Sequence, residues 1–348
     1  MEPIKGRGSA HNPKNRFLDT HLEYEVDEET GELERPDTQL LTDHTSEIIS
    51  TNKSPDISFD VSLNPYRGCE HGCVYCYARP THEYLGMSPG LDFESKIVVK
   101  YNAAKLLREK LAKKSWKPQT LIMSGVTDPY QPIEKKLRIT RGCVEVLAEC
   151  NHPLVIITKN YRVTRDIDLL SQLADKNAVK VVLSITSLDK TITDTMEPRT
   201  SRPNRRLKAV RELSEAGIPV HVNIAPLIPG LTDDELVPIM EASAEAGAES
   251  VAVVPLRLPF AVKDLFVKWL EDHYPDRKKK VLNRIREMKD GKLNRYEFGE
   301  RFQIEGPYAE QIKQLLQIHT KRLGLNQNIK PLETKHFRRP ETDQLRLF

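Results

Sequence analysis

Three cysteines lie within eight residues of one another, at Cys69, Cys73 and Cys76, in a Cys-x3-Cys-x2-Cys pattern with no fourth cysteine nearby. Three thiolates suit a cubane iron–sulfur cluster with one iron left open, whereas four would indicate an electron carrier or a structural zinc site. An incomplete set therefore predicts that a ligand from outside the protein completes the metal. Gly68 and Gly72 would let the loop adopt positive φ angles and approach the cluster closely.

The same loop allows two other interpretations. One is a zinc site with His71 or His82 as the fourth ligand, and the other is three buried thiols without a shared role. Zinc sites are usually built from paired Cys-x2-Cys units spread along the chain, and only one such pair occurs here. Three unrelated thiols so close together would be a rare coincidence. The pattern therefore favours the iron–sulfur cluster.

The composition predicts a cytoplasmic protein that is not bound to a membrane. Lys and Arg number 53 against 50 for Asp and Glu, so the net charge of +3 gives no general basic field for nucleic acid. The chain starts without the apolar core of a signal peptide, and no apolar stretch approaches the roughly 20 residues that a membrane helix needs. The remaining cysteines, Cys143 and Cys150, lie in an apolar helical pattern, which suits burial in a reducing compartment.

Strand and helix patterns alternate through the middle of the chain. Alternating apolar residues at 57–63 predict a half-buried strand that leads to the cysteine loop. Short apolar runs predict five further buried strands, at 120–123, 154–157, 179–185, 220–224 and 250–254. Helical spacing between them predicts helices at 141–149, 165–174, 205–216 and 233–246. Parallel βα units of this kind form a barrel or an open sheet.

We expect four parts along the chain. Residues 1–53 form a partly disordered N-terminal arm, because a basic stretch is followed by an acidic one with little periodicity. The α/β barrel domain spans residues 54–260, and a helical C-terminal extension spans residues 261–325, with helical patterns at 265–272, 278–288 and 308–323. Residues 326–348 form a flexible polar tail.

Polar residues gather directly after the predicted strands, where parallel βα barrels bind their ligands. The second strand is followed by Ser-Gly-Val-Thr-Asp-Pro-Tyr at 124–130, and the third is followed by Thr158 and Lys159. Ser184 ends the fourth strand. Each of these residues taken singly also suits a turn or a helix cap, but together they predict a functional layer at one end of the sheet.

Several longer motifs give this pattern a family resemblance. They include NPYRGCEHGCVYCYARPTHEY, SGVTDPYQPIE, LSITSLD, MEPRTSRPNRRLKAV and VHVNIAPLIPGLTD. Together they resemble the spore photoproduct lyase-related branch of the radical SAM superfamily, often labelled DNA repair photolyase-like, and in particular an uncharacterised bacterial subgroup. The resemblance spans residues 54–259. It implies a partial (β/α)6 barrel and a [4Fe–4S] cluster whose open iron is chelated by S-adenosylmethionine.

The resemblance also assigns roles to single residues. The three loop cysteines would hold the cluster, and Tyr75 would lie near the adenine of the cofactor. Thr127 and Ser184 match polar cofactor contacts, and Lys159 matches a lysine that binds the cofactor carboxylate. An ammonium at that place can pair with a carboxylate in a water-poor site.

The catalytic candidates are Tyr77 and Asp128. Tyr77 follows the third cysteine and could donate a hydrogen atom or an electron, while an aromatic ring packed on the loop is the alternative. Asp128, together with Glu134, would orient the substrate or bind the cofactor amine. We expect Glu197 and Arg199 to pair with each other.

The chain departs from the lyase after the second strand. The lyase returns a hydrogen atom to its product from a cysteine there, whereas this chain has Gly125 and no cysteine between Cys76 and Cys143. Reversal of a thymine dimer by the same relay is therefore not implied.

Two segments near the C-terminus suggest partners. Residues 276–295 carry nine Lys or Arg against three Asp or Glu, a local charge of +6 that could contact phosphates or simply be solvated. The last five residues, Gln344 to Phe348, resemble the short peptide with which bacterial repair proteins dock on the DNA sliding clamp. The alternative is a tail whose last two residues, Leu347 and Phe348, fold back onto the barrel.

The sequence therefore predicts an enzyme that reductively cleaves S-adenosylmethionine at a [4Fe–4S] cluster to form a 5′-deoxyadenosyl radical. The resemblance favours nucleic acid or damaged DNA as the substrate, and modification of RNA, protein or a metabolite is the alternative. An electron donor such as flavodoxin or ferredoxin would be required. The alternative from another class is a non-catalytic iron–sulfur or zinc protein that serves as an interaction module.

Overall fold

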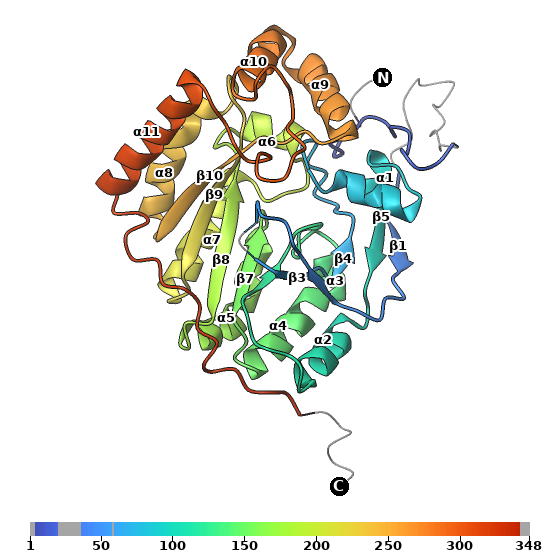
Figure 1. The fold of residues 1–348 in the computed structure, drawn as a ribbon, viewed down its shortest axis with the longest axis vertical. Helices are drawn as coiled ribbons and strands as arrows, with labels where there is room; N and C mark the ends of the chain where they lie inside the picture. Colours follow the sequence, from blue (N-terminus) through green and yellow to red (C-terminus); the bar gives the residue numbers. More distant parts are fainter. Residues whose placement is uncertain (1–3, 20–35, 58, 342–348) are drawn as a thin grey trace.

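The computed structural model describes residues 4–19, 36–57 and 59–341 of the chain. Its centre is a seven-stranded sheet with the order β10-β9-β8-β7-β6-β3-β2 (Figure 1). Six strands are parallel, and β2 runs antiparallel to β3. The strands are β2 Ile49–Thr51, β3 Val61–Leu63, β6 Leu121–Met123, β7 Leu154–Thr158, β8 Val179–Ile185, β9 Val220–Leu227 and β10 Ser250–Pro255. The parallel strands are the six that the sequence predicted, so the predicted α/β fold class is confirmed.

The two faces of the sheet differ in chemistry. In β9, Val220, Val222 and Ile224 are buried in the hydrophobic core that the sheet shares with the helices. The residues between them, His221 and Asn223, are only partly buried and hydrogen-bond each other at 3.0 Å between Nε2 and Oδ1. In β9, this alternation places apolar side chains under the helices and polar side chains on the opposite face.

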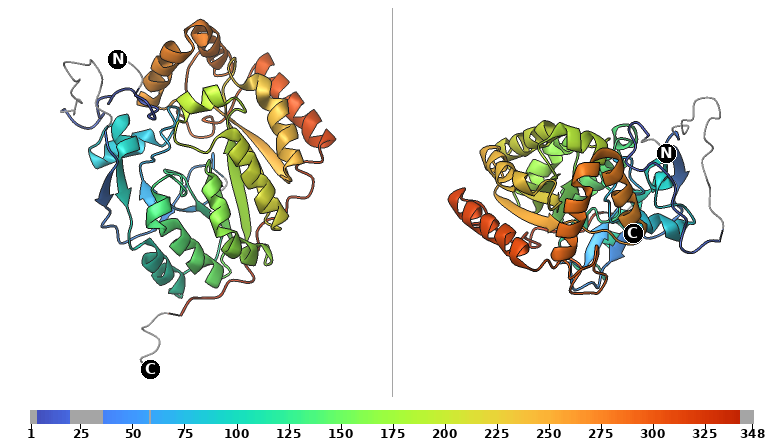
Figure 2. Two further views of the ribbon diagram at one scale, coloured as in Figure 1. Left: turned by 180° about the vertical axis from the view of Figure 1, so that it is seen from behind. Right: turned by 90° about the horizontal axis from the view of Figure 1, so that it is seen from above.

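Helices cover one face of the sheet (Figure 2). They are α2 Ala103–Ala112, α4 Ile139–Glu149, α5 Ile167–Ala174, α7 Pro203–Glu215 and α8 Leu236–Glu245. Shorter α and 3-10 helices also occur along this part of the chain, at α3 Glu134–Leu137, η2 Tyr161–Asp166, α6 Lys190–Met196 and η3 Asp233–Glu235. Cys143 on α4 and Cys150 at its end are completely buried in this core, as their apolar pattern indicated.

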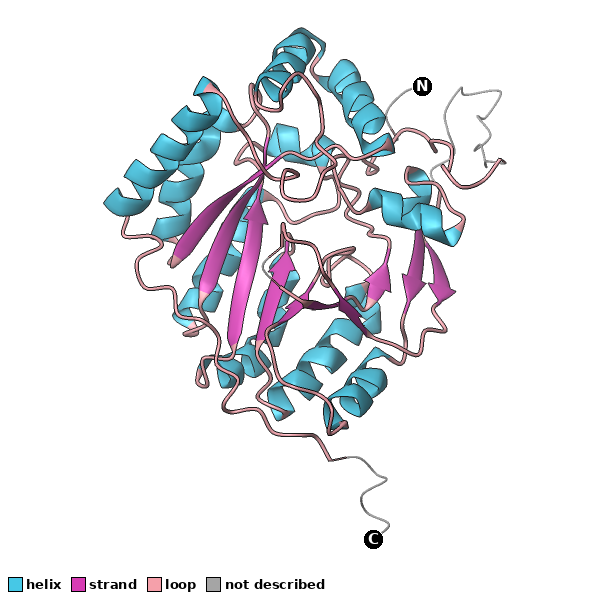
Figure 3. Cartoon of the chain, in the orientation of Figure 1, coloured by secondary structure: helices cyan, strands magenta, loops and turns pink. Residues whose placement is uncertain are grey.

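A second, three-stranded sheet with the order β1-β5-β4 was not predicted from the sequence (Figure 3). It consists of β1 Gln39–Thr42, β4 Tyr66–Arg67 and β5 Lys96–Val99, and it adjoins η1 Arg79–Leu85 and α1 Leu91–Ser95. Tyr66, Ile97 and Val99 form its buried core. Because β4 directly precedes the cysteine loop and β5 directly follows α1, this sheet fixes both ends of the segment that carries the three thiols.

The described part of the N-terminal arm lies on this segment. The backbone amides of Gly8 and Ser9 donate hydrogen bonds to the Glu94 carboxylate of α1, at 3.0 and 2.9 Å. Arg16 forms an ion pair with the buried Glu83 of η1 at 2.7 Å. The arm therefore packs beside the cysteine loop. The division of the chain into four parts stays a prediction.

The C-terminal region is helical, as predicted, with α9 Ala261–His273, α10 Pro275–Glu287 and α11 Pro307–Arg322. The apolar faces of α9 and α10 share a core with Cys73, Val74 and Tyr75 of the cysteine loop. Further along, Arg338 donates its backbone amide to the Cys150 carbonyl at 2.9 Å. The predicted clamp peptide lies outside the described residues. No helix in the described part of the chain is both long and apolar enough to span a membrane.

Candidate functional site

The cysteine loop is compact because its glycines allow close backbone contacts. Gly68 and Gly72 both have positive φ angles, of 79° and 68°. A Cβ atom on Gly68 would lie 2.9 Å from the Phe93 carbonyl oxygen, and one on Gly72 would lie 2.7 Å from a Glu94 carboxylate oxygen. Any side chain at these two positions would therefore push the loop away from α1.

Arg79 supports the backbone of the cysteine loop. Its guanidinium is completely buried, forms an ion pair with Glu94, and donates hydrogen bonds to the carbonyls of Cys73 at 2.9 Å and Gly72 at 3.3 Å. No local sequence pattern predicts this pair, because the two residues are 15 positions apart and meet only when α1 folds back. Arg79 and Glu94 thus position the backbone that carries the thiols.

The three thiols are suited to a metal centre. Burial raises the pKa of all three, and negative charge on Cys73 and Cys76 would raise the pKa of Cys69 further. Nearby cationic side chains offset only part of this effect at Cys73 and Cys76. A cationic centre would stabilise three thiolates that the protein alone leaves as thiols. The donor set therefore fits an iron–sulfur cluster.

The zinc alternative is less well supported. His71 contacts Asn160 with Nε2 at 3.1 Å and Asp128 with Nδ1 at 3.3 Å, and His82 contacts the Lys96 carbonyl with Nε2 at 2.9 Å. In the described residues, no three His, Cys, Asp or Glu side chains converge closely enough to hold one metal ion. A cubane cluster binds its thiolates through different irons, so its ligands lie further apart than those of one zinc ion.

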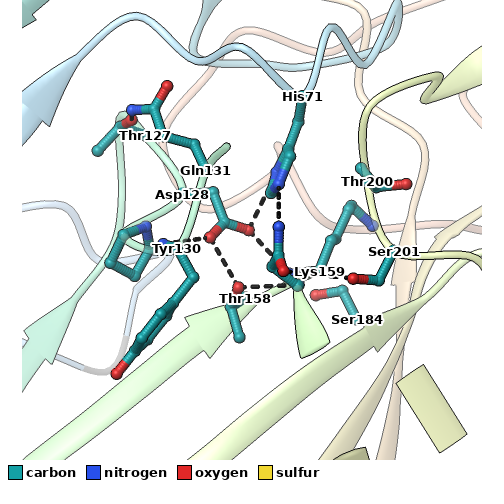
Figure 4. A network of polar contacts seen from close by, with 12 residues as sticks. His71, Thr127, Asp128, Tyr130, Gln131, Thr158, Lys159, Ser184, Thr200 and Ser201 are labelled. Carbon is teal, nitrogen blue, oxygen red and sulfur yellow. Dashed lines mark hydrogen bonds and ion pairs between the residues drawn. The ribbon is translucent and has the colours of Figure 1, made fainter. Parts of the chain in front are cut away.

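Asp128 joins the ends of two strands to the loop (Figure 4). One carboxylate oxygen accepts from Thr158 Oγ1 at 2.7 Å, and the other accepts from the Lys159 amide at 2.8 Å and lies 3.3 Å from His71. Burial would raise the pKa of Asp128, but the charge of His71 and these hydrogen bonds together lower it. Both oxygens are thus engaged within the protein.

Thr127 also contacts the cysteine loop rather than standing apart from it. Its hydroxyl donates to the Gly68 carbonyl at 2.6 Å and accepts from Gln131 Nε2 at 3.0 Å. The Gln131 side chain in turn accepts from the Glu70 amide at 2.9 Å. Gln131, which we did not select from the sequence, is completely buried and holds the first half of the loop in place.

Lys159 and Tyr75 meet at a second buried carboxylate, Glu197. Lys159 Nζ donates to the Ala225 carbonyl at 2.7 Å and to Thr186 Oγ1 at 3.1 Å, and lies 3.6 Å from Glu197. The Tyr75 hydroxyl donates to the same carboxylate. Burial lowers the pKa of Lys159, while the Glu197 charge opposes that shift.

The expected ion pair between Glu197 and Arg199 was wrong. Glu197 pairs with Arg206 of α7, whereas Arg199 pairs with Glu70 at 2.9 Å. Residues two apart in this irregular segment point in different directions, and α7 returns Arg206 to the carboxylate. Glu134 lies outside the site: it accepts hydrogen bonds from Tyr66 and the Thr140 amide and pairs with Arg165.

The remaining candidates lie at the edge of this network. Ser184 is buried beside Lys159 and Ser201 (Figure 4), and its carbonyl accepts from Arg206 at 2.9 Å. Tyr77 is 52% exposed, and its ring lies 5.6 Å from the Arg257 guanidinium carbon. The structure thus brings Tyr75, Thr127, Asp128, Lys159 and Ser184 together around the cysteine loop and leaves Tyr77 partly exposed beside Cys76.

Comparison with known proteins agrees with this arrangement. Residues 63–242 match the model of the radical SAM superfamily. An uncharacterised protein of Mycobacterium tuberculosis is 37% identical over 242 residues, which cover 68% of this chain and 70% of that protein. The radical SAM Nalpha-GlyT isomerase of Pseudomonas phage M6 is 23% identical over 274 residues, covering 78% of this chain and 53% of that protein.

Among solved structures, a spore photoproduct lyase mutant with bound AdoMet and dinucleoside spore photoproduct superimposes with a TM-score of 0.57. The sequences are 17% identical, and the superposition covers 82% of this chain and 80% of the lyase. At this identity the likeness is one of fold. The family match spans more than half of the chain and includes the cysteine loop, the four following parallel strands of the central sheet, β6 to β9, and most of α8. The chain therefore belongs to the radical SAM superfamily of enzymes.

Proposed function

We propose that the protein reductively cleaves S-adenosylmethionine at a [4Fe–4S] cluster held by Cys69, Cys73 and Cys76. The observation that carries this proposal is a set of three neighbouring thiols, two buried and one partly exposed, on a loop that the polar ends of the parallel strands surround. In this superfamily the cluster supplies the electron that breaks the sulfonium bond and yields a 5′-deoxyadenosyl radical. The chain contributes the ligands, the cofactor contacts and the exclusion of water.

Lys159 is our candidate for the cofactor carboxylate. An ammonium has three N–H donors, and two of them reach Thr186 and the Ala225 carbonyl. The ion pair with Glu197, at 3.6 Å, is longer than a hydrogen bond. One donor is therefore free to meet a ligand carboxylate without loss of the existing contacts. Glu197 would keep the ammonium charged in its buried position.

Three other residues complete the proposed cofactor site. Tyr75, held by Glu197, would pack near the adenine, and Ser184 would supply a polar contact beside Lys159. Thr127 uses its hydroxyl hydrogen on the Gly68 carbonyl, so its contribution to cofactor binding would be to fix the loop. We propose the same positioning role for Asp128, whose carboxylate spans two strand ends and His71.

We propose nucleic acid as the substrate class. The lyase of similar fold holds a dinucleoside photoproduct, and α10 lies in the segment with a local charge of +6. Tyr77, exposed next to the third cysteine, would face the substrate and donate a hydrogen atom or an electron. A flavodoxin or ferredoxin would supply electrons, and the clamp peptide would bring the enzyme to replicating DNA.

The test is anaerobic reconstitution followed by measurement of iron, sulfide and 5′-deoxyadenosine. The wild type should carry one cluster and release 5′-deoxyadenosine from S-adenosylmethionine when dithionite is added. Replacing any loop cysteine by Ala should abolish release, whereas Cys143→Ala, a buried thiol of the helical core, is the matched control and should retain it. Stoichiometric zinc without iron, or equal loss of activity in the control, would contradict the proposal.

A further inference from the structure

Exposed aromatic side chains gather at one end of the molecule. Seven aromatic side chains of the described residues are among its exposed large apolar groups. Four of them, Phe17, Tyr84, Phe260 and Tyr296, contact one another or share an arginine. The fifth, Tyr77, lies against Arg257, three residues before Phe260. We call these five residues the aromatic surface. They come from the arm, the cysteine loop, η1, the start of α9 and the loop after α10. Such a concentration of exposed rings indicates a binding surface.

Four rings of the aromatic surface form a continuous row, those of Tyr84, Phe17, Phe260 and Tyr296. Phe17 stacks on Tyr84 with ring centroids 5.1 Å apart and planes 29° apart. The Arg16 guanidinium carbon lies 5.2 Å from the Phe17 centroid and 3.6 Å from the Phe260 centroid, so it bridges the two rings. Phe260 then meets Tyr296 at 5.3 Å. The four rings are 43% to 75% exposed, so part of each ring is accessible to solvent.

The row leads to the cysteine loop. The segment after β10 runs beside the loop after α10, because the Leu258 amide donates to Asn294 Oδ1 at 3.0 Å. Phe260 lies at one end of that segment and Arg257 at the other. The Arg257 guanidinium carbon is 5.6 Å from the Tyr77 ring, and Tyr77 directly follows Cys76. The aromatic surface therefore extends from the arm to the residue next to the proposed cluster.

Arg257 differs from the other arginines of this region in its partners. Arg16 pairs with Glu83, and Arg301 pairs with Asp56. Arg257 forms no hydrogen bond or ion pair with another residue of the described ranges, and its buried Nε atom has no partner. Among the described residues, its guanidinium lies over two rings, those of Tyr77 and Phe302. A guanidinium left without a counter-ion beside accessible rings is suited to an anionic group such as a phosphate.

We propose that the aromatic surface binds single-stranded nucleic acid, with unpaired bases stacked on its rings and a backbone phosphate at Arg257. Stacking needs a free ring face and an unstacked base, and arginines over the rings add cation–π attraction. In a duplex the bases are stacked on each other and offer no face to these rings. The inference rests on the proposed function, since it specifies the substrate class of the same site.

The test is fluorescence anisotropy with the full-length, cluster-loaded protein and a labelled single-stranded oligothymidylate, without S-adenosylmethionine. Tyr84→Ala and Phe17→Ala should each weaken binding by roughly 5- to 100-fold, the range for loss of one stacked base. Tyr101→Ala is the matched control, because Tyr101 is 49% exposed but lies before α2, away from this surface, and it should bind as the wild type does. An abasic oligomer of the same length should bind much more weakly.

A second variant tests the phosphate contact. Arg257→Gln should weaken binding of every oligomer sequence alike and reduce the slope of log K against log salt by about 0.7, as expected for one phosphate contact to a single strand. An unchanged slope would overturn the role of Arg257. Equal binding by wild type and Tyr84→Ala, equal binding of the abasic oligomer, or tighter binding of duplex would each overturn the aromatic surface as a single-strand site.

The two proposals fail in different ways. Release of 5′-deoxyadenosine in the absence of nucleic acid reports the cofactor chemistry alone. A protein that releases it but binds no oligomer would overturn the aromatic surface and leave the cofactor chemistry intact. A protein that binds oligomers through these rings but never cleaves the cofactor would overturn the proposed chemistry and leave the surface intact.

Discussion

The Glu197 carboxylate and the Arg206 guanidinium form an ion pair in which neither side chain is exposed to solvent. The same carboxylate accepts a hydrogen bond from Tyr75 and lies 3.6 Å from Lys159 Nζ. Burial would raise the pKa of Glu197, but the charges of Arg206 and Lys159 lower it overall, so the carboxylate is ionised at neutral pH. One buried anion thus organises two cations and a phenol beside the cysteine loop.

Glu197→Gln should destabilise the fold strongly, because it leaves the Arg206 charge buried without a partner. The expected loss is about 3–5 kcal/mol of unfolding free energy. Thermal unfolding of the variant and the wild type measures it. Asp194→Asn is the control: Asp194 pairs with Arg202 at the surface, and its loss should cost at most about 1 kcal/mol. A Glu197→Gln variant as stable as the wild type would show that the pair is not needed.

Lys159→Ala should weaken S-adenosylmethionine binding and leave the cluster in place. The expected loss is about 1.5–3 kcal/mol, the range for a hydrogen bond to a charged group. Equilibrium dialysis with labelled cofactor measures the affinity, and iron content checks the cluster. Lys208→Ala, which removes an exposed lysine of α7, is the control. Unchanged affinity in a cluster-loaded Lys159→Ala protein would assign the ammonium a structural role only.

The sequence predicted those features that depend on local patterns. Three cysteines on one short loop are visible without a structure, and β8 is nearly all apolar because both of its faces are buried. The order of six parallel strands follows from their alternation with helices. Polar residues after these strands could therefore be placed near the loop in advance.

Features that depend on contacts between distant parts of the chain were missed or were predicted wrongly. Arg79 reaches Glu94, and Gln131 reaches Glu70, only after separate elements fold together. The pairing of Glu197 with Arg206 needs the turn into α7, which spacing along the chain does not reveal. The second sheet was missed because β1 and β4 are four and two residues long and pair with β5 from elsewhere in the chain.

Lys289 should make the unfolding free energy depend on pH in the alkaline range. Its ammonium is buried, and burial together with the charges of Arg257 and Arg295 lowers its pKa to about 8. Above pH 8 the folded protein loses this proton while the unfolded chain, in which the lysine has its ordinary pKa of 10.5, keeps it. The contribution of Lys289 to the unfolding free energy should therefore rise between about pH 8 and 10.5.

The comparison of wild type with Lys289→Met isolates this effect. The difference in unfolding free energy between the two should shift in favour of the wild type by about 3 kcal/mol over that pH range. Thermal unfolding at several pH values, with both proteins in the same buffers, measures the shift. Parallel pH profiles for the two proteins would show that Lys289 has an ordinary pKa.

A synthetic peptide of the last residues should bind the purified DNA sliding clamp with micromolar affinity, about −8 kcal/mol. Gln344 would make polar contacts while Leu347 and Phe348 enter an apolar groove. Replacing these three residues by Ala in the full-length protein should remove clamp binding without changing 5′-deoxyadenosine release. No binding by the intact protein, together with protection of Phe348 from proteolysis, would favour a tail folded onto the barrel.

The central claim is that three cysteines leave one iron of the cluster open for S-adenosylmethionine. Electron–nuclear double resonance on the reduced cluster, with cofactor labelled with ¹⁵N at its amino group, tests it most directly. We expect a hyperfine coupling to the labelled nitrogen in the wild type and in Cys143→Ala, and none in Cys73→Ala. A four-thiolate cluster that shows no coupling in the wild type, or zinc in place of iron, would contradict it.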